Sequence, residues 1–255
     1  MKTIRTTCPY CGVGCGVLAS VDDAGQVSVR GDDQHPANLG RLCVKGAALG
    51  ETTGLAGRLL TPEVDGQQVA WPQALAETAS RLQQVIDQHG PQAVAFYASG
   101  QLLTEDYYAA NKLMKGFIGA ANIDTNSRLC MSSAVVGYKR AFGEDVVPCS
   151  YEDVENSDLV VLVGSNAAWT HPVLYQRLVQ AKQTNPQMKV VVIDPRSTAT
   201  CDIADLHLAL APGSDAGLFV GLLNLIQGTD EWPVERVAAF CGLSPQEIGA
   251  FYDWF

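Results

Sequence analysis

The first 57 residues contain short stretches in which apolar and polar residues alternate, and they are rich in Cys and Gly. Apolar and polar residues alternate over 17–21 and again over 26–30, and Asp22-Asp23-Ala24-Gly25 separates the two runs. A period of two on both sides of a turn sequence predicts a β-hairpin. We therefore expect a small β-hairpin domain over 1–57.

From residue 58 onward, helical and strand periods alternate. Apolar residues recur at helical spacing in some segments, and short apolar runs bounded by turn residues separate them. The predicted helices are 72–89, 104–117, 132–142, 173–182, 215–226, 233–240 and 245–254, and the predicted strands are 92–98, 159–163, 190–193 and 206–210. Strands that alternate with helices predict a parallel sheet covered by helices. The expected fold class is α/β, with αβ domains over 58–148 and 149–255.

Charge and hydropathy exclude two classes of partner. The formal net charge is −10 and no basic run occurs, which argues against a nucleic acid. No stretch approaches the roughly 20 apolar residues that a membrane span needs. The first seven residues have no apolar core of an export signal, so we expect a cytoplasmic location. Eight cysteines in such a chain indicate metal or redox chemistry rather than disulfides.

Four of the cysteines are clustered near the start of the chain. Their spacing is Cys8-x2-Cys11-x3-Cys15-x27-Cys43. Four thiolates can hold either zinc or an iron–sulfur cluster. Structural zinc favours two CxxC pairs and only one is present, while interleaved glycines let the backbone N–H groups approach cluster sulfurs. The spacing favours iron–sulfur and leaves zinc as the alternative.

The four-Cys pattern ends in Cys43-Val44-Lys45-Gly46. Together these features resemble the bis-molybdopterin-guanine-dinucleotide oxidoreductases, which include nitrate reductases and formate dehydrogenases. The resemblance implies a [4Fe–4S] cluster on the four cysteines and a molybdenum bis(molybdopterin guanine dinucleotide) cofactor. It also implies that Lys45 lies between cluster and pterin, where its ammonium favours the reduced state of both by electrostatics. An ordinary surface lysine is the alternative interpretation.

A second constellation surrounds Cys130. On residue type alone, a buried structural cysteine is the more common interpretation, although a thiolate near a helix start suits a soft metal. The run from Arg128 to Ser133, Arg-Leu-Cys-Met-Ser-Ser, resembles the assimilatory nitrate reductases. That resemblance implies that Cys130 is the molybdenum ligand. It also implies pterin contacts at Gln101 and Asn126, with Arg128 in the same cofactor site.

Small and polar residues follow three of the predicted strands. They are Gly164, Ser165 and Asn166, then Asp194, Pro195 and Arg196, then Gly213 and Asp215. Ligands of open parallel sheets bind beyond the carboxyl ends of the strands, where glycine lets a pyrophosphate come close. No GxGxxG fingerprint is present, and turn or helix-start roles would also explain single members. The resemblance implies that the set holds a guanine dinucleotide.

The resemblance implies reduction of nitrate to nitrite. The alternatives are a formate dehydrogenase of the same family and a non-catalytic iron–sulfur electron-transfer module. Formate chemistry in this family pairs the ligand with a following His that handles a proton, and Met131 cannot do so. Ferredoxin, flavodoxin or an NADH-dependent flavoprotein would each suit as electron donor. Because catalytic subunits of the family are several times longer, we interpret the chain as a truncated N-terminal part, inactive alone.

Overall fold

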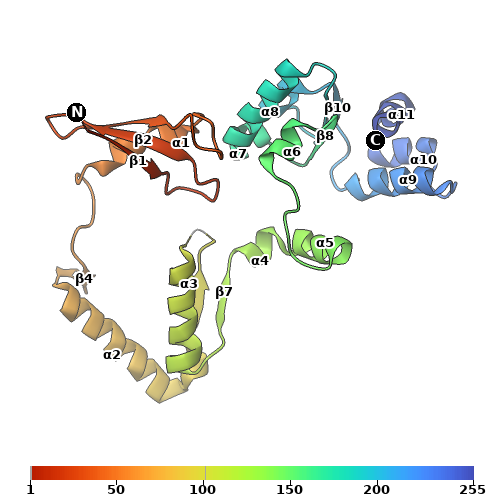
Figure 1. Cartoon of the computed structure of the whole chain (residues 1–255). Coiled ribbons are helices and arrows are strands. Elements are labelled where there is room, and N and C mark those ends of the chain that lie inside the picture. The colour runs from red at the N-terminus through yellow and green to blue at the C-terminus, as the bar shows by residue number, and fades with distance from the viewer. Residues whose placement is uncertain (1, 101) are drawn as a thin grey trace. The chain divides into compact units, whose positions relative to one another are not determined.

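The computed structural model describes residues 2–100 and 102–255, which group into two compact units (Figure 1). The first unit takes in the chain up to Cys8, residues 13–50 and Pro148–Phe255. The second unit comprises Pro9–Gly12 and Glu51–Val147. Among the described residues, no helix combines the length and the apolar character that crossing a membrane requires.

The first unit begins with an antiparallel sheet of β1 (Lys2–Thr7), β2 (Gly16–Val21) and β3 (Val27–Gly31), in that order. The predicted hairpin is confirmed as β2 and β3. Its turn is closed by the Asp22 carboxylate, which accepts from the backbone N–H of Ala24 at 2.9 Å and of Gln26 at 2.8 Å. Strand β1 was not predicted, because all six of its residues are exposed and carry no alternation.

A parallel sheet forms the centre of the rest of the first unit. Its order is β10 (Leu206–Leu208), β9 (Lys189–Ile193), β8 (Leu159–Val163), and both pairings are parallel as predicted. Successive residues of β9 face opposite sides, since side chains in a strand alternate. Val190 and Val192 pack in one cluster, and Val191 and Ile193 pack in another. The predicted strand 206–210 is two residues too long.

Helices supply the other side of each cluster. Helix α8 (Pro172–Thr184) contributes Leu178 and Ala181 to the first cluster. The second cluster is built with α9 (Asp215–Gln227), α10 (Val234–Cys241) and α11 (Pro245–Trp254). The short helices of this unit are α1 (Val44–Ala47), η1 (Leu49–Thr53, whose last residues lie in the second unit), α6 (Tyr151–Glu155), α7 (Ala167–Thr170) and η4 (Ala199–Ile203).

The second unit has a smaller hydrophobic core than the first, and its buried residues are Val94, Met114 and Ala120. Its elements are β4 (Glu63–Val64), β5 (Gln67–Gln68), α2 (Trp71–His89), η2 (Pro91–Ala93), β6 (Phe96–Ala98), α3 (Thr104–Asn111), the π-helix η3 (Lys112–Ile118), β7 (Ile123–Thr125), α4 (Ser127–Cys130) and α5 (Ser132–Phe142). Strands β6 and β7 pair in parallel.

The predicted strand 92–98 is wrong over its first half. Pro91 begins a 3-10 turn in which the Val94 N–H donates to the Pro91 carbonyl at 3.2 Å, and only Phe96–Ala98 is extended and paired. The proline ring presets the turn geometry, which overrides the apolar pattern that follows it.

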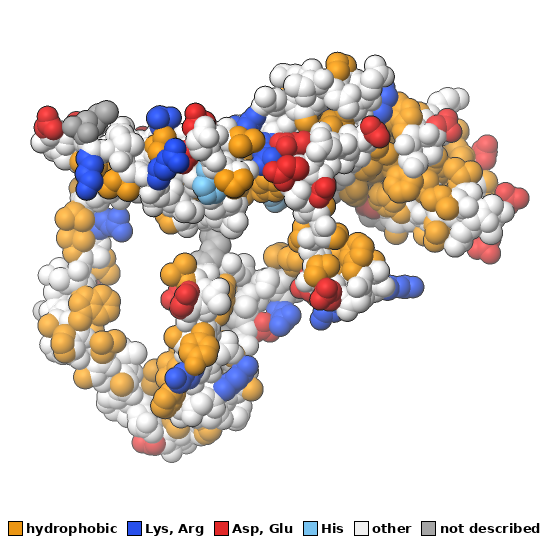
Figure 2. Space-filling view, in the orientation of Figure 1, with side chains coloured by type: hydrophobic (Ala, Val, Ile, Leu, Met, Phe, Trp, Pro, Cys, Tyr) orange, Lys and Arg blue, Asp and Glu red, His pale blue; other side chains and the backbone are white. Residues whose placement is uncertain are grey.

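Large apolar side chains remain exposed on the helices after the sheet. Figure 2 shows orange side chains gathered over the region of α9, α10 and α11. The exposed fractions are 65% for Ile226, 52% for Phe240 and 64% for Phe255. Apolar patches of this kind on a protein surface usually mark a contact with further protein.

Gly221 lies at a tight approach among the three C-terminal helices. A Cβ there would lie 2.4 Å from Val237 Cγ2 and 2.5 Å from the Tyr252 hydroxyl. That hydroxyl donates to the Leu218 carbonyl at 2.6 Å, so it cannot move away without losing a buried hydrogen bond. We expect Gly221→Ala to lower the free energy of unfolding by about 1–3 kcal/mol through overpacking.

Urea unfolding measures this effect, and Gly249→Ala is the matched control. Gly249 lies inside α11, and no atom beyond the backbone of its own helix comes within 4 Å of the place that a Cβ would take. Alanine there should raise stability by about 0.5–1 kcal/mol, as expected for Gly to Ala in a helix. Equal effects of the two substitutions would contradict the packing of the three helices.

Candidate functional site

The first and third cysteines lie on adjacent strand ends. Cys8 follows β1 and Cys15 precedes β2, and the Cys8 N–H donates to the Cys15 carbonyl at 2.8 Å. Both residues are buried, with exposed fractions of 8% and 6%. The sheet therefore fixes the backbones of these two cysteines opposite each other. Cys11, in the loop that connects them, is exposed.

The fourth cysteine caps a helix. Cys43 occupies the N-cap position of α1, and its Sγ accepts from the backbone N–H of Gly46 at 3.5 Å. A backbone N–H directed at sulfur stabilises a thiolate and is one of the contacts that tune an iron–sulfur cluster. Lys45 lies in the same single turn of helix and is exposed.

Asn38 joins the segments of the third and fourth cysteines. Its side chain is fully buried. Its Oδ1 accepts from Gly16 N–H at 2.8 Å, and its Nδ2 donates to the carbonyls of Gly16 at 3.0 Å and Arg41 at 2.8 Å. One amide thus ties the residue after Cys15 to the residue two before Cys43. No sequence signal pointed to this role, because an asparagine in a polar loop is ordinary.

These groups are of the kind that hold an iron–sulfur cluster. Two cysteines lie at the ends of paired strands, a glycine-rich loop joins them, and the backbone N–H of Gly46 is directed at the Cys43 sulfur. Within the part of the chain that the structure describes, no group of three or more Cys, His, Asp or Glu side chains is arranged to hold a metal ion. The convergence of the four thiols on one cluster stays a prediction.

Cys130 is the last residue of α4, and Met131 is the N-cap of α5. The cysteine therefore lies two residues before the longer helix rather than inside its first turn. Cys130 is exposed, and its Sγ lies 3.9 Å from the Ser127 carbonyl oxygen. Exposure argues against a buried structural cysteine and leaves the sulfur accessible to a ligand.

Two of the other residues predicted to lie near Cys130 belong to the same short helix or cap it. Arg128 pairs with Asp124 at 2.9 Å, one helical turn away. The pKa of Asp124 lies below its usual value. The main cause is the hydrogen bond from the Thr125 N–H, and the second is the hydrogen bond from the Arg128 guanidinium. Asn126 occupies the N-cap position of α4, and its Oδ1 would lie 3.4 Å from a Cβ on Gly100. Gln101 lies outside the described residues.

The carboxyl ends of β8, β9 and β10 share one edge of the parallel sheet, and the first two predicted segments follow β8 and β9 directly. The third segment begins five residues after the end of β10. The Gly164 N–H donates to the Ile193 carbonyl at 2.8 Å with φ at +56°, a conformation that favours glycine. The Asp194 carboxylate accepts from the Arg196 N–H at 2.8 Å, which closes the turn after β9. Ser165 and Pro195 lie within these two turns.

Two residues that the sequence analysis missed support this edge. Thr200 is fully buried, and its hydroxyl donates to Asn166 Oδ1 at 3.0 Å, which fixes the orientation of the Asn166 side chain. His207 Nε2 lies 2.8 Å from the Asp194 carbonyl oxygen. Both contacts join residues at least 13 positions apart, so only the folded chain reveals them.

The third segment leads into α9. Gly213 has φ at +83°, Ser214 is buried and its hydroxyl donates to the Ala211 carbonyl at 2.6 Å, and Asp215 is the first helical residue. Free N–H groups at a helix start, beside a glycine turn, are the arrangement that binds phosphate groups. The edge therefore fits the diphosphate of a dinucleotide.

Comparison with protein families assigns the chain. Residues 1–53 match the model of the molybdopterin oxidoreductase Fe4S4 domain, and residues 58–228 match the model described as molybdopterin oxidoreductase. The chain belongs to the molybdopterin oxidoreductase family, whose cofactors are a molybdopterin and, in the N-terminal domain, a [4Fe–4S] cluster.

Curated relatives include several nitrate reductases and a formate dehydrogenase subunit. The chain is 74% identical to the nitrate reductase of Klebsiella oxytoca over 100% of this chain and 31% of that protein. It is 43% identical to the periplasmic nitrate reductase of Desulfovibrio desulfuricans over 84% of this chain and 29% of that protein. It is 38% identical to the assimilatory nitrate reductase of Haloferax mediterranei over 90% of this chain and 33% of that protein. The chain thus spans about a third of these relatives.

A solved structure shares the fold. Acetylene hydratase from Pelobacter acetylenicus matches 98% of this chain and 38% of its own, with a TM-score of 0.81 and 23% identity. This likeness confirms the α/β fold with its small N-terminal strand domain.

Proposed function

We propose that this chain serves the reduction of nitrate to nitrite, with electrons delivered through a [4Fe–4S] cluster to molybdenum. The observation that carries the proposal is 74% identity over the whole chain with a nitrate reductase. When bound, molybdenum supplies the site that accepts an oxygen atom from nitrate. Two electrons and two protons balance the release of nitrite and water.

The chain's residues divide into three roles in this proposal. Cys8, Cys11, Cys15 and Cys43 hold the cluster, and the Gly46 N–H stabilises the Cys43 thiolate. Cys130, exposed at the end of α4, is the ligand to molybdenum. The sheet edge binds the guanine dinucleotide through the segments that begin at Gly164, Asp194 and Gly213, and Gln101, Asn126 and Arg128 contact the cofactor near Cys130.

Formate oxidation is the competing activity within the family. The residue after Cys130 decides between them, because formate chemistry requires a proton acceptor beside the metal and the thioether of Met131 offers none. Met131 is 38% exposed, so its side chain is not buried in a hydrophobic core.

A parallel assay tests the proposal. The protein as its gene encodes it, purified anaerobically, should reduce nitrate with reduced viologen and oxidise formate negligibly. Rapid formate oxidation with no nitrate reduction would assign the chain to the competing activity. A bound cluster with neither activity would assign it to electron transfer alone.

Lys45 offers a test of electron passage. Lys45→Met should lower the cluster midpoint potential by about 60 mV or more, equivalent to a tenfold shift in a one-electron equilibrium, because a nearby positive charge favours the reduced cluster. Nitrate turnover should slow while iron and molybdenum contents stay unchanged.

Lys2→Met is the matched control for Lys45→Met. Lys2 is exposed at the end of β1 remote from Cys8, roughly 15–20 Å along the strand at about 3.3 Å per residue, which exceeds the Debye length. A redox titration followed by electron paramagnetic resonance measures both. The same potential in both variants would return Lys45 to an ordinary surface role.

We further propose a cytoplasmic, assimilatory enzyme whose donor is a ferredoxin, a flavodoxin or an NADH-dependent flavoprotein. Support comes from the residues around Cys130, which resemble assimilatory enzymes, and from the Haloferax relative named assimilatory. The periplasmic relative from Desulfovibrio defines the competing location. Fractionation of the native cells decides between them: activity released with periplasmic contents would contradict the proposal.

A further inference from the structure

A buried arginine of α8 holds the segment that leads to Cys43. Arg177 is 2% exposed. Its Nη1 donates to the Pro36 carbonyl at 2.8 Å and to the Ala37 carbonyl at 3.2 Å. These carbonyls belong to the segment 36–42, called here the strap, which runs directly into Cys43. The guanidinium therefore bonds to backbone of the iron–sulfur domain from a helix about 140 residues further along the chain.

The other side of the same guanidinium is fixed by α6. Glu155 accepts from Arg177 Nε and, at 2.9 Å, from Nη2 in a two-point contact. Glu152 lies 3.4 Å from Nη2, and the Tyr151 ring centre lies 5.1 Å from Cζ. A buried charge is unfavourable unless it is paired and fully hydrogen-bonded. The Glu155 carboxylate neutralises the Arg177 charge. The strap carbonyls accept hydrogen bonds from the remaining guanidinium nitrogen, Nη1.

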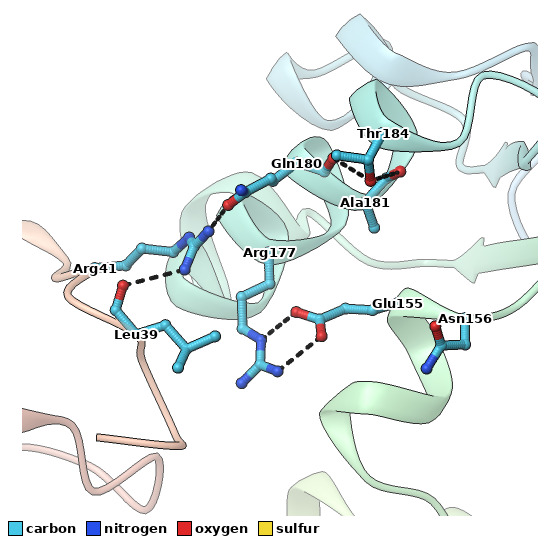
Figure 3. Close-up of a pocket in the computed structure, with 8 residues that line it drawn as sticks. All are labelled: Leu39, Arg41, Glu155, Asn156, Arg177, Gln180, Ala181 and Thr184. Carbon is cyan, nitrogen blue, oxygen red and sulfur yellow. Dashed lines mark hydrogen bonds and ion pairs between the residues drawn. The ribbon is translucent and has the colours of Figure 1, made fainter. Parts of the chain in front are cut away.

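Other side chains of α8 contact the strap on either side of Arg177. Figure 3 shows Arg177 facing Glu155, while Gln180, one turn along the helix, reaches Arg41 of the strap. Gln176 Nε2 lies 3.4 Å from the carbonyl oxygen of Leu42, which is the residue before Cys43. The strap thus contacts α8 through its own first two residues and its last two.

The strap is also tied to the third ligand. Asn38, inside the strap, holds the backbone of Gly16, which follows Cys15. A displacement of the strap therefore changes the spacing between Cys15 and Cys43 as well as the direction of Cys43. The planar fork of an arginine bridges a carboxylate and carbonyls at once, which a lysine ammonium cannot do in the same geometry.

We propose that Arg177 is a positioning residue for the [4Fe–4S] cluster: through the strap it sets where the fourth ligand, Cys43, lies relative to Cys15. This rests on the proposed function only in requiring the cluster, not nitrate chemistry. Arg177 is not itself a ligand and acts through the backbone carbonyls of Pro36 and Ala37.

The test compares Arg177→Met and Arg177→Lys in the protein as its gene encodes it. Iron release to a chelator should be about tenfold to a hundredfold faster in Arg177→Met, which is the factor expected for a lost hydrogen bond to a charged group. Arg177→Lys keeps the positive charge but not the fork, so it should fold yet release iron faster than the unchanged protein. The electron paramagnetic resonance spectrum of the reduced cluster and its midpoint potential should shift in both variants.

Lys182→Met is the matched control. Lys182 lies on the same helix and pairs with Asp205 at 2.6 Å, but its other contact is the Met188 carbonyl rather than the strap. It should lower thermal stability while leaving iron release, spectrum and potential unchanged. Unchanged spectrum and iron release in Arg177→Lys, or equal changes in Lys182→Met, would overturn the proposal. Nitrate turnover does not enter these readouts, so a protein that holds a cluster but fails to reduce nitrate still tests Arg177.

Discussion

Replacing Cys43 with Ser is expected to abolish assembly of the [4Fe–4S] cluster. The change removes one thiolate of four and also the sulfur that receives the Gly46 N–H at the start of α1. A serine hydroxyl is a poor ligand at neutral pH, because the soft iron site prefers thiolate. Anaerobic reconstitution should load about four irons and four sulfides in the unchanged protein and far less than this in Cys43→Ser.

Cys149→Ser is the control for this experiment. Cys149 is exposed and lies outside the four-Cys pattern, so its loss should leave the iron and sulfide contents unchanged. Iron–sulfur loading that survives Cys43→Ser would contradict the ligand assignment. Stable zinc binding without labile sulfide in the unchanged protein would restore the zinc alternative that the spacing left open.

Replacing Cys130 with Ala is expected to eliminate nitrate turnover while the cluster remains. Residues that merely support a metal ligand commonly contribute about 10–100-fold in metal affinity or activity, so loss of the ligand itself should exceed about a hundredfold. The sulfur is exposed and its one described contact is the weak one to Ser127, so the substitution should not unfold α4.

Two readouts separate chemistry from folding in Cys130→Ala. The signal of the reduced cluster should match that of the unchanged protein, because the four cluster ligands lie within the first 43 residues. Cys149→Ala again serves as the control, since it removes an equally exposed thiol. Full nitrate turnover in Cys130→Ala would remove Cys130 from the molybdenum site.

The local pattern of the sequence predicted those elements whose apolar residues follow a helical period or form a short apolar run bounded by turn residues. Strand β9 and the helices around it are examples, because their apolar positions are the ones that the folded chain buries. Strand β1 escaped prediction because it is an edge strand whose six residues are all exposed and show no apolar alternation. Strand β7 escaped because three residues are too few for a period.

The candidate site divides in the same way. Ligand types and spacings, such as those of Cys8 to Cys43, are local properties that a sequence displays. The groups that position them are not: Arg177 meets its carbonyl partners across about 140 residues, Asn38 meets Gly16 across 22, and Thr200 meets Asn166 across 34. Each is a buried polar residue whose partner the fold supplies, so its role follows from tertiary contacts alone.

Electrons should pass from the cluster to nitrate, and a single-turnover experiment measures this transfer. The anaerobic protein, as its gene encodes it, is reduced with dithionite and freed of excess reductant, and the reduced-cluster signal is followed by electron paramagnetic resonance after nitrate is added. We expect nitrate to abolish the signal and nitrite to appear, one nitrite for every two electrons. A signal that persists with nitrate, or an oxidised cluster that formate reduces, would contradict it.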